Sequence, residues 1–132
     1  MAKRIAAIRK YRPVIKLERT MQTPQLVEDI AMHTGLNTGE ILFVVYEFRD
    51  AILMAHQHGQ PVKVEGLGTF TPTIRMDGSL DILFRPEPSM LNKLNDPRKL
   101  YATILNKANI GKTTDDFVAK WNKEQPDNLV ED

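Results

Sequence analysis

The sequence VKVEGLGTFTPTIRMDGSLDILF occupies residues 62–84 and has the pattern of a β-ribbon. Apolar and polar residues alternate along residues 70–76, and the alternation resumes along residues 80–85. Because successive side chains of a strand point to opposite faces, a period of two predicts two strands that each bury one face. Asp77-Gly78 between them is a strong hairpin signal. We therefore predict an antiparallel ribbon that is entered through the Gly-x-Gly-x-Phe corner at residues 66–70.

Two loop lengths are compatible with the turn of this ribbon. A two-residue loop at Asp77-Gly78 would place Ile74 opposite Asp81, which sets an apolar side chain against an acid. A slip of one residue moves every side chain of a strand to the other face, so the apolar pairing should determine the register. We therefore predict a three-residue loop that includes Ser79, with the pairs Met76 with Leu80, Ile74 with Ile82 and Pro72 with Phe84.

Composition limits the chain to a small globular protein. Its 132 residues, 42% of them hydrophobic, suffice for one core, so we expect a single small domain with appendages. The chain has no cysteine, which excludes disulfides and thiolate chemistry and suits a reducing compartment. No apolar run approaches the ~18 residues of a membrane span, and the first residues lack the apolar core of a signal peptide. We expect a cytoplasmic protein with no membrane partner.

Charge is unevenly distributed, although the net charge is only +1. Residues 1–20 hold seven Lys/Arg against one acid, whereas residues 113–132 hold six acids against two lysines. A basic segment indicates a polyanionic partner such as nucleic acid. The alternative is a solvated tail that only aids solubility.

Two helices are expected before the ribbon. Thr23-Pro24 has the pattern of a helix start, with Thr23 as the N-cap, and Gly35 that of a helix end. Asn37 starts a second helix, which runs to about His58 and stops at Gly59. The apolar arc of this second helix is too broad for one short helix and a small sheet to cover. We infer that a second copy of the chain covers the rest.

Other elements are expected at the two ends of the chain. Residues 12–18 are consistent with an added edge strand. Beyond the ribbon, we expect a short helix capped by Ser89, a helix that restarts at Asp96-Pro97 and reaches Leu105, and a last helix over about residues 114–125 that Pro126 stops. From Asp127 onward we expect a frayed end.

The order of these elements resembles the HU and integration-host-factor family of bacterial DNA-bending proteins. The matching blocks are LVEDIAMHTGL (residues 26–36), the helix over residues 41–59, VKVEGLGTF (residues 62–70) and PSMLNKL (residues 88–94). The resemblance covers roughly residues 23–95. It implies an α+β fold of two N-terminal helices and a small antiparallel sheet, with two copies intertwined as a homodimer. In that family the paired β-arms enter the DNA minor groove and an apolar wedge unstacks a base step.

The resemblance divides the chain into three expected parts. Residues 1–20 form a basic N-terminal extension, residues 21–95 an HU-like dimerisation and DNA-binding domain, and residues 96–132 a C-terminal helical extension with an acidic tail. The β-arm is shorter than the family's arms, with strands of about six residues or ~20 Å. Its tip carries Asp77 and no proline, and Met76 is a candidate wedge.

Motifs for catalysis or cofactor binding are incomplete. Gly111-Lys112-Thr113 resembles the end of a phosphate-binding loop, but position 106 is Asn106 rather than glycine. Gly66-Leu67-Gly68 leads into a strand rather than a helix, which differs from a dinucleotide-binding turn. The three histidines have no metal-ligand spacing. We expect no enzyme activity, no cofactor, no metal and no small-molecule substrate.

The expected function is that of an HU-like, nucleoid-associated homodimer that binds double-stranded DNA mainly through phosphates, with little sequence specificity. The alternative is a homodimer of the same fold that acts as a protein-interaction or scaffolding module without DNA, which the near-neutral charge of residues 21–112 favours. On the first interpretation the N-terminal cluster is a flexible cationic arm along a groove. The candidate DNA-binding residues are Lys3, Arg4, Arg9, Lys10, Arg12, Arg75, Arg85 and Lys93.

Overall fold

The structure is a computed structural model that describes residues 1–131 and divides the chain into two compact units. The central unit comprises Thr20–Leu100, and the terminal unit comprises both ends of the chain, Met1–Arg19 and Tyr101–Asp132. The two segments that we expected to be separate extensions therefore contribute to one unit.

The central unit begins with two helices, α2 (Thr23–Thr34) and α3 (Thr38–Gln57). Gly35 ends α2 in the left-handed conformation with φ 75°, as its sequence position predicts. The Asn37 side chain accepts a hydrogen bond of 2.7 Å from the backbone N–H of Gly39 and caps α3. Gln22, rather than Thr23, is the N-cap of α2. The predicted start of α2 was therefore wrong by one residue, since Pro24 tolerates either place in the first turn.

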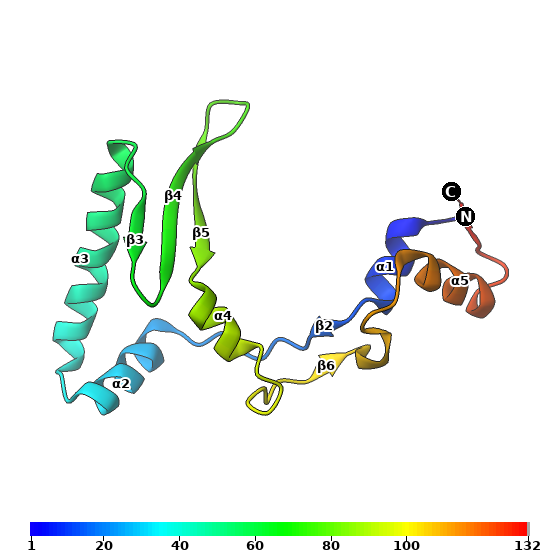
Figure 1. Ribbon diagram of the computed structural model, residues 1–132, viewed down its shortest axis with the longest axis horizontal. Coiled ribbons are helices and arrows are strands. Elements are labelled where there is room, and N and C mark those ends of the chain that lie inside the picture. The colour runs from blue at the N-terminus through cyan, green and yellow to red at the C-terminus, as the bar shows by residue number, and fades with distance from the viewer. Residues whose placement is uncertain (132) are drawn as a thin grey trace. The chain divides into compact units, whose positions relative to one another are not determined.

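A three-stranded antiparallel sheet follows, in the order β3 (Val62–Val64), β4 (Gly68–Ile74) and β5 (Leu80–Pro86) (Figure 1). The corner between β3 and β4 requires glycine, because a Cβ at Gly68 would lie 2.4 Å from the carbonyl oxygen of Arg85. The short helix α4 (Pro88–Leu94) comes next. Its N-cap is Glu87 and not Ser89, because Pro88 already occupies the first turn.

The ribbon has a three-residue loop, but the predicted register was wrong by two residues. The observed partners are Ile74 with Leu80, Pro72 with Ile82 and Phe70 with Phe84. The backbone N–H of Arg75 donates to the carbonyl of Ser79 at 2.8 Å, so the loop is residues 76–78. Gly78 has φ 88° and takes the last loop position, where the left-handed conformation is required. Because the shift is even, every side chain keeps its predicted face.

The apolar face of the sheet packs against α3. The ring centroid of Phe70 lies 6.2 Å from that of Phe48 and 4.8 Å from that of Phe84. Even so, Val27, Ile41 and Ile52 are the large apolar side chains of the described central unit that are buried. Phe43 and Val44 on α3 are 65% and 62% exposed. One copy of the chain therefore leaves the core of this unit open.

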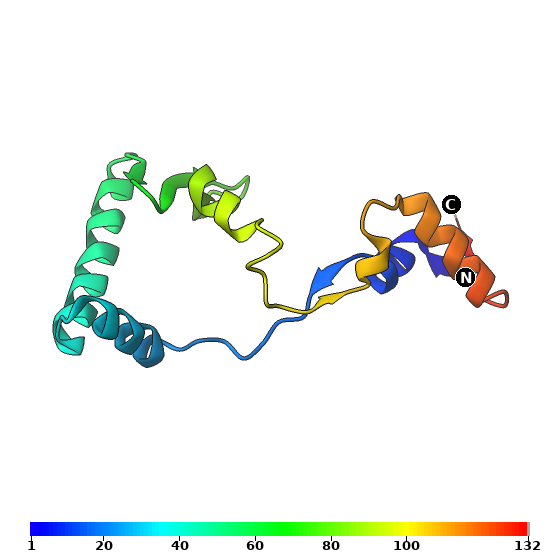
Figure 2. The same cartoon turned by 60° about the horizontal axis from the view of Figure 1, so that its bottom comes forward.

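The terminal unit has its core between α1 (Arg4–Tyr11) and α5 (Thr114–Glu124). Ala7, Tyr11 and Phe117 are its buried members. Thr113 and Asp116 form a capping box at the start of α5, which agrees with the predicted last helix. Figures 1 and 2 both show α5 beside α1. Residues 4–11 of the basic N-terminal segment thus form a packed helix, and the prediction of a flexible arm was wrong.

Two short strand pairs complete the terminal unit. β1 (Ala2–Lys3) pairs in parallel with β7 (Val130–Glu131), and β2 (Val14–Ile15) pairs antiparallel with β6 (Ile104–Leu105). A 3-10 turn, η1, lies at Lys107–Asn109. The predicted edge strand is present at β2, and its partner is β6.

Two predictions for the C-terminal segment were wrong. The helix expected from Asp96-Pro97 to Leu105 is absent, because residues 104–105 pair as β6 and the carbonyl of Thr103 accepts from the N–H of Lys16 at 2.8 Å. The end expected to fray from Asp127 forms β7 instead. Trp121 Nε1 donates to the carbonyl of Asn128 at 2.7 Å and anchors this segment. Residues 103–105 are held by residues 14–16, which are distant in sequence, and residue 128 is held by Trp121 across a turn. Neither contact has a local sequence pattern.

Candidate nucleic-acid interface

The eight predicted DNA-binding residues fall into two groups, one on each unit. Arg75, Arg85 and Lys93 belong to the central unit, and the five N-terminal cations belong to the terminal unit. All eight are exposed except Arg4, which is partly buried. The structure therefore yields two candidate surfaces.

Acidic side chains balance the charge at the tip of the hairpin. Arg75 follows Ile74, the last paired residue of β4, and its Nη2 lies 2.6 Å from Asp81 Oδ2. The backbone N–H of Ile82 and, after it, the Arg75 guanidinium hold the pKa of Asp81 below its usual range. The Ser79 hydroxyl, which donates to Asp77 Oδ1 at 2.6 Å, likewise lowers the pKa of Asp77. Both acids stay ionised at neutral pH, so the tip presents little free positive charge.

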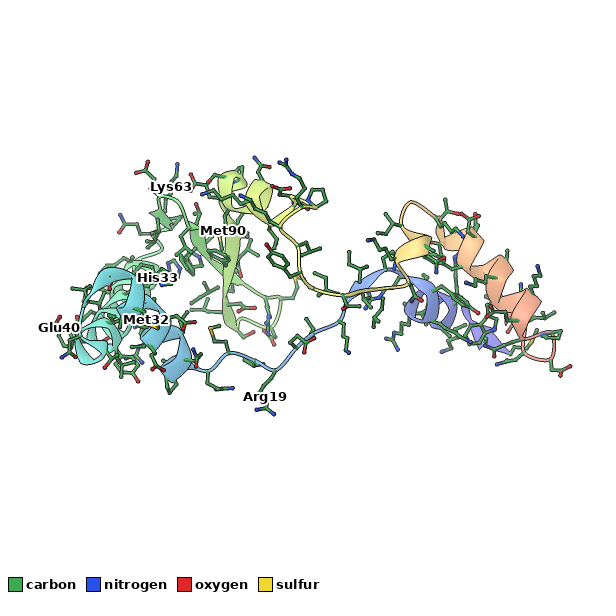
Figure 3. The ribbon with its side chains drawn as sticks, turned by 90° about the horizontal axis from the view of Figure 1, so that it is seen from below. Arg19, Met32, His33, Glu40, Lys63 and Met90 are labelled. Carbon is green, nitrogen blue, oxygen red and sulfur yellow. The ribbon has the colours of Figure 1, made fainter. Side chains whose placement is uncertain are left out.

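A cationic row crosses the sheet at the base of the hairpin. The register places Lys63 opposite Thr69, and Thr69 opposite Arg85. These three side chains lie on the face away from Phe70, because they occupy the alternate positions of their strands. Figure 3 shows the exposed Lys63 on β3. The row borders a hollow of about 240 Å³, which Glu87 also lines.

The chemistry of this row suits a phosphate group. Within residues 1–131, no carboxylate oxygen lies within 4.0 Å of the charged nitrogens of Lys63 or Arg85. Two cations with a hydroxyl between them can all donate to one anion. The sequence analysis included Arg85 but missed Lys63 and Thr69. Only the strand register brings them together, although the position of Lys63 between Val62 and Val64 indicated that it faces away from the core.

Lys93 lies in the last turn of α4, which is a favourable place for a cation near the negative end of the helix dipole. It is exposed, as are Met90 and Leu91 on the same short helix. Its position therefore leaves the ammonium group accessible to a ligand.

The five N-terminal cations divide into two sets. Lys3 is the strand partner of Glu131, and Arg4 pairs with the Asp115 carboxylate at the start of α5. Both positions link basic and acidic ends of the chain within the terminal unit. Arg9, Lys10 and Arg12 have no carboxylate within ion-pair distance in the described residues.

Positive charge is concentrated on the terminal unit. The central unit contains seven Lys/Arg against ten Asp/Glu, a net charge of −3, whereas the terminal unit contains eleven against seven, a net charge of +4. The two values add to the net charge of +1 of the chain. Long-range attraction for a polyanion therefore comes from the terminal unit.

Other kinds of site are not found in the part of the chain that the structure describes. No group of three or more histidines and acids in residues 1–131 is arranged to hold a metal ion. Among the helices of the same residues, none has the length and apolarity needed to cross a membrane.

Comparison with known proteins finds a family for most of this chain. The model of the HU-HIG family, described as an HU domain fused to a wHTH, Ig or glycine-rich motif, matches residues 5–83. Among solved structures, a mutant HU from Thermotoga maritima is 19% identical, with a TM-score of 0.49, and the match covers 56% of this chain and 99% of that one. Comparison with curated proteins yields no match.

Proposed function

The chain belongs to the HU-HIG family, whose HU domains are fused to a wHTH, Ig or glycine-rich motif, and from this membership we propose that it binds double-stranded DNA as a homodimer. Binding occurs mainly through phosphates and with little sequence specificity. On this proposal the protein is nucleoid-associated and cytoplasmic.

The observation that carries the DNA proposal is the row of Lys63, Thr69 and Arg85. It places two cations without acidic partners at the root of the hairpin, on the face that is not used to pack against α3. Backbone contacts of this kind fix a protein on a duplex without reading its sequence. We include Lys93 and the N-terminal cations Arg9, Lys10 and Arg12 among the contacts. Lys3, Arg4 and Arg75 lie beside acids, so we expect smaller contributions from them.

The open core of the central unit supports the homodimer. Phe43 and Val44 on α3 and Leu80 on β5 are all more than half exposed. Near them lies an apolar hollow of about 540 Å³ between α3 and the sheet, which includes Val45 and Phe70 in its lining. Burial of such side chains contributes roughly 25 cal/mol for each Å² removed from water. A second copy, which brings the same surfaces, completes the core.

A salt titration tests the DNA proposal. The full-length protein is titrated into fluorescent duplexes of two unrelated sequences between about 50 and 200 mM salt. We expect similar affinities for the two duplexes and a linear fall of log affinity with log salt, by ~0.9 for each phosphate contact.

A matched pair of variants locates the contacts on the sheet. Lys63→Gln/Arg85→Gln should reduce the slope, whereas Arg98→Gln/Lys99→Gln, which removes the same charge outside the sheet, should leave it nearly unchanged. Absence of binding at low salt would refute the proposal and favour a protein-interaction or scaffolding dimer, consistent with the net charge of −3 of the central unit.

A further inference from the structure

We propose that the terminal unit is a second phosphate-binding surface for duplex DNA, built from both ends of the chain around Lys10 and Lys120. The inference rests on the proposed DNA binding and assigns part of it to residues outside the ribbon. Lys120 comes from the acid-rich C-terminal segment, so neither the sequence patterns nor the family match, which ends at residue 83, indicates it.

The arrangement of α1 and α5 gathers basic residues at one end of the terminal unit. Arg4 pairs with Asp115 near the start of both helices, and the Tyr11 hydroxyl donates to Glu124 near the end of both. The first contact joins the starts of the two helices, and the second joins their ends. Their C-terminal ends lie together and bring the last turn of α1, with Lys10, next to the last turns of α5, with Lys120.

Two ammonium groups lie beside one aromatic ring in this cluster. Lys10 Nζ is 5.4 Å from the centroids of both the Tyr11 and Trp121 rings, and Lys120 Nζ is 5.0 Å from that of Tyr11. Cation–π attraction keeps both side chains over the rings and limits their freedom before a ligand arrives. Both lysines are exposed, and neither has a carboxylate within ion-pair distance in residues 1–131.

The backbone carbonyls beside this cluster are already hydrogen-bonded, whereas Glu124 keeps its negative charge. The carbonyls at the end of α1 would face an anion with negative partial charge. Asn106 Nδ2 donates to those of Lys10 and Arg12 at 2.9 and 3.0 Å, and Asn109 Nδ2 donates to that of Tyr11 at 2.7 Å. The Glu124 carboxylate accepts the Tyr11 hydroxyl.

More cations surround the pair. Arg9 and Arg12 are exposed at the same end of α1, and Lys123 follows Lys120 by three residues, which places both on one side of α5. Together with the net charge of +4 of this unit, they provide an electrostatic surface for a chain of phosphates rather than for a single anion.

The test uses the single tryptophan of the full-length protein, Trp121, as a reporter within the proposed surface. Binding of a labelled duplex is followed by anisotropy, and Trp121 emission is followed with an unlabelled duplex of the same sequence. We expect the emission to change with the same midpoint as the anisotropy. Lys10→Gln/Lys120→Gln should lower the salt slope by ~0.9 for each lysine that no longer meets a phosphate, which is roughly 8-fold in affinity per lysine at 0.1 M salt.

Arg98→Gln/Lys99→Gln is the charge-matched control, and we expect it to retain the wild-type slope. If the duplex binds while Trp121 emission stays constant and the Lys10/Lys120 variant keeps the wild-type slope, the inference is overturned and Lys10 is no longer a contact, but the proposed DNA binding through Lys63, Thr69 and Arg85 stands. If the wild-type protein binds no duplex at low salt, both fail. A folding defect in the double variant would appear in its melting curve. In that case the change in Trp121 emission of the wild-type protein on binding the duplex decides whether the inference holds.

Discussion

Arg75 shows why the presence of a cation in a suitable stretch does not make it available to a ligand. Its guanidinium lies 2.6 Å from Asp81, and both side chains are about half exposed or more. An exposed pair of this kind contributes little to stability, in the range of ~0–1 kcal/mol. Its main consequence is electrostatic, because Asp81 offsets the positive charge that the hairpin could offer to DNA.

Asp81→Asn should therefore strengthen DNA binding. The substitution removes one negative charge and leaves Arg75 free, so we expect tighter binding and a salt slope steeper by ~0.9 if Arg75 reaches a phosphate. Asp96→Asn is the control, since it releases Arg98 outside the hairpin. Equal effects of the two substitutions in the duplex titration would show that the hairpin is not a DNA contact.

Tyr11 gives a prediction about pH. Burial first, and then its hydrogen bond to Glu124, raise the pKa of Tyr11 to about 12. Because the folded-state pKa lies above the unfolded value, this contribution to stability is fully present below pH ~10 and is lost as the pH rises toward 12. The melting temperature of the terminal unit, measured by Trp121 emission, should therefore fall as the pH rises from about 10 to 12.

Tyr11→Phe isolates the contribution of this hydroxyl from other effects of high pH. The variant should lose about 1 kcal/mol at neutral pH through the missing hydrogen bond. It should also have a smaller fall in melting temperature between pH 10 and 12 than the wild type. Identical pH profiles for the two proteins would contradict the assigned role of the hydroxyl.

The corner between β3 and β4 depends on a glycine at position 68. Gly68 has φ 151°, and an added Cβ would lie 2.4 Å from the Arg85 carbonyl oxygen and 2.8 Å from the Phe84 ring. We expect Gly68→Ala to destabilise the central unit by about 2–3 kcal/mol, because backbone on β5 must move. Gly78→Ala, at φ 88° in open space, should lose only about 1 kcal/mol. Chemical denaturation measures the free energy of unfolding of both variants, and equal losses would argue against close contact at the corner.

Elements set by neighbouring residues could be predicted from the sequence, and elements set by distant partners could not. Gly35 and Asn37 mark helix boundaries through local backbone rules, and the structure confirms them. The ribbon was predicted on the correct faces, but its register depended on the conformation of Gly78. Residues 104–105 have helical spacing, yet they pair with residues 14–15. No local pattern indicates that pairing.

The candidate sites illustrate the same limit across the full chain. Arg85 was identified from the sequence, but its partners Lys63 and Thr69 emerge only from the register of three strands. Lys120 lies in a segment whose summed charge is negative, and it joins Lys10 only after both ends have folded together. Counting charge along the sequence located the basic segment correctly. It missed Lys120, which joins Lys10, and also Lys63 and Thr69, which join Arg85.

Disruption of the exposed face of α3 should separate the two copies of the proposed homodimer. Val44 is 62% exposed in one copy, and we expect Val44→Lys to place a charge inside the shared core. The variant should sediment as a monomer of 15.1 kDa and melt at a lower temperature than the wild type. Ile110→Lys, at a 58% exposed position of the terminal unit, is the control and should remain dimeric.

The mass of the complex with a short duplex tests both halves of the proposal together. A duplex of about 20 base pairs is mixed with the full-length protein at low salt, and the complex is weighed by sedimentation equilibrium. The expected result is two chains of 15.1 kDa on each duplex, dissociating as salt is added. A free monomer that sediments separately from the duplex would contradict the proposal of a DNA-binding homodimer.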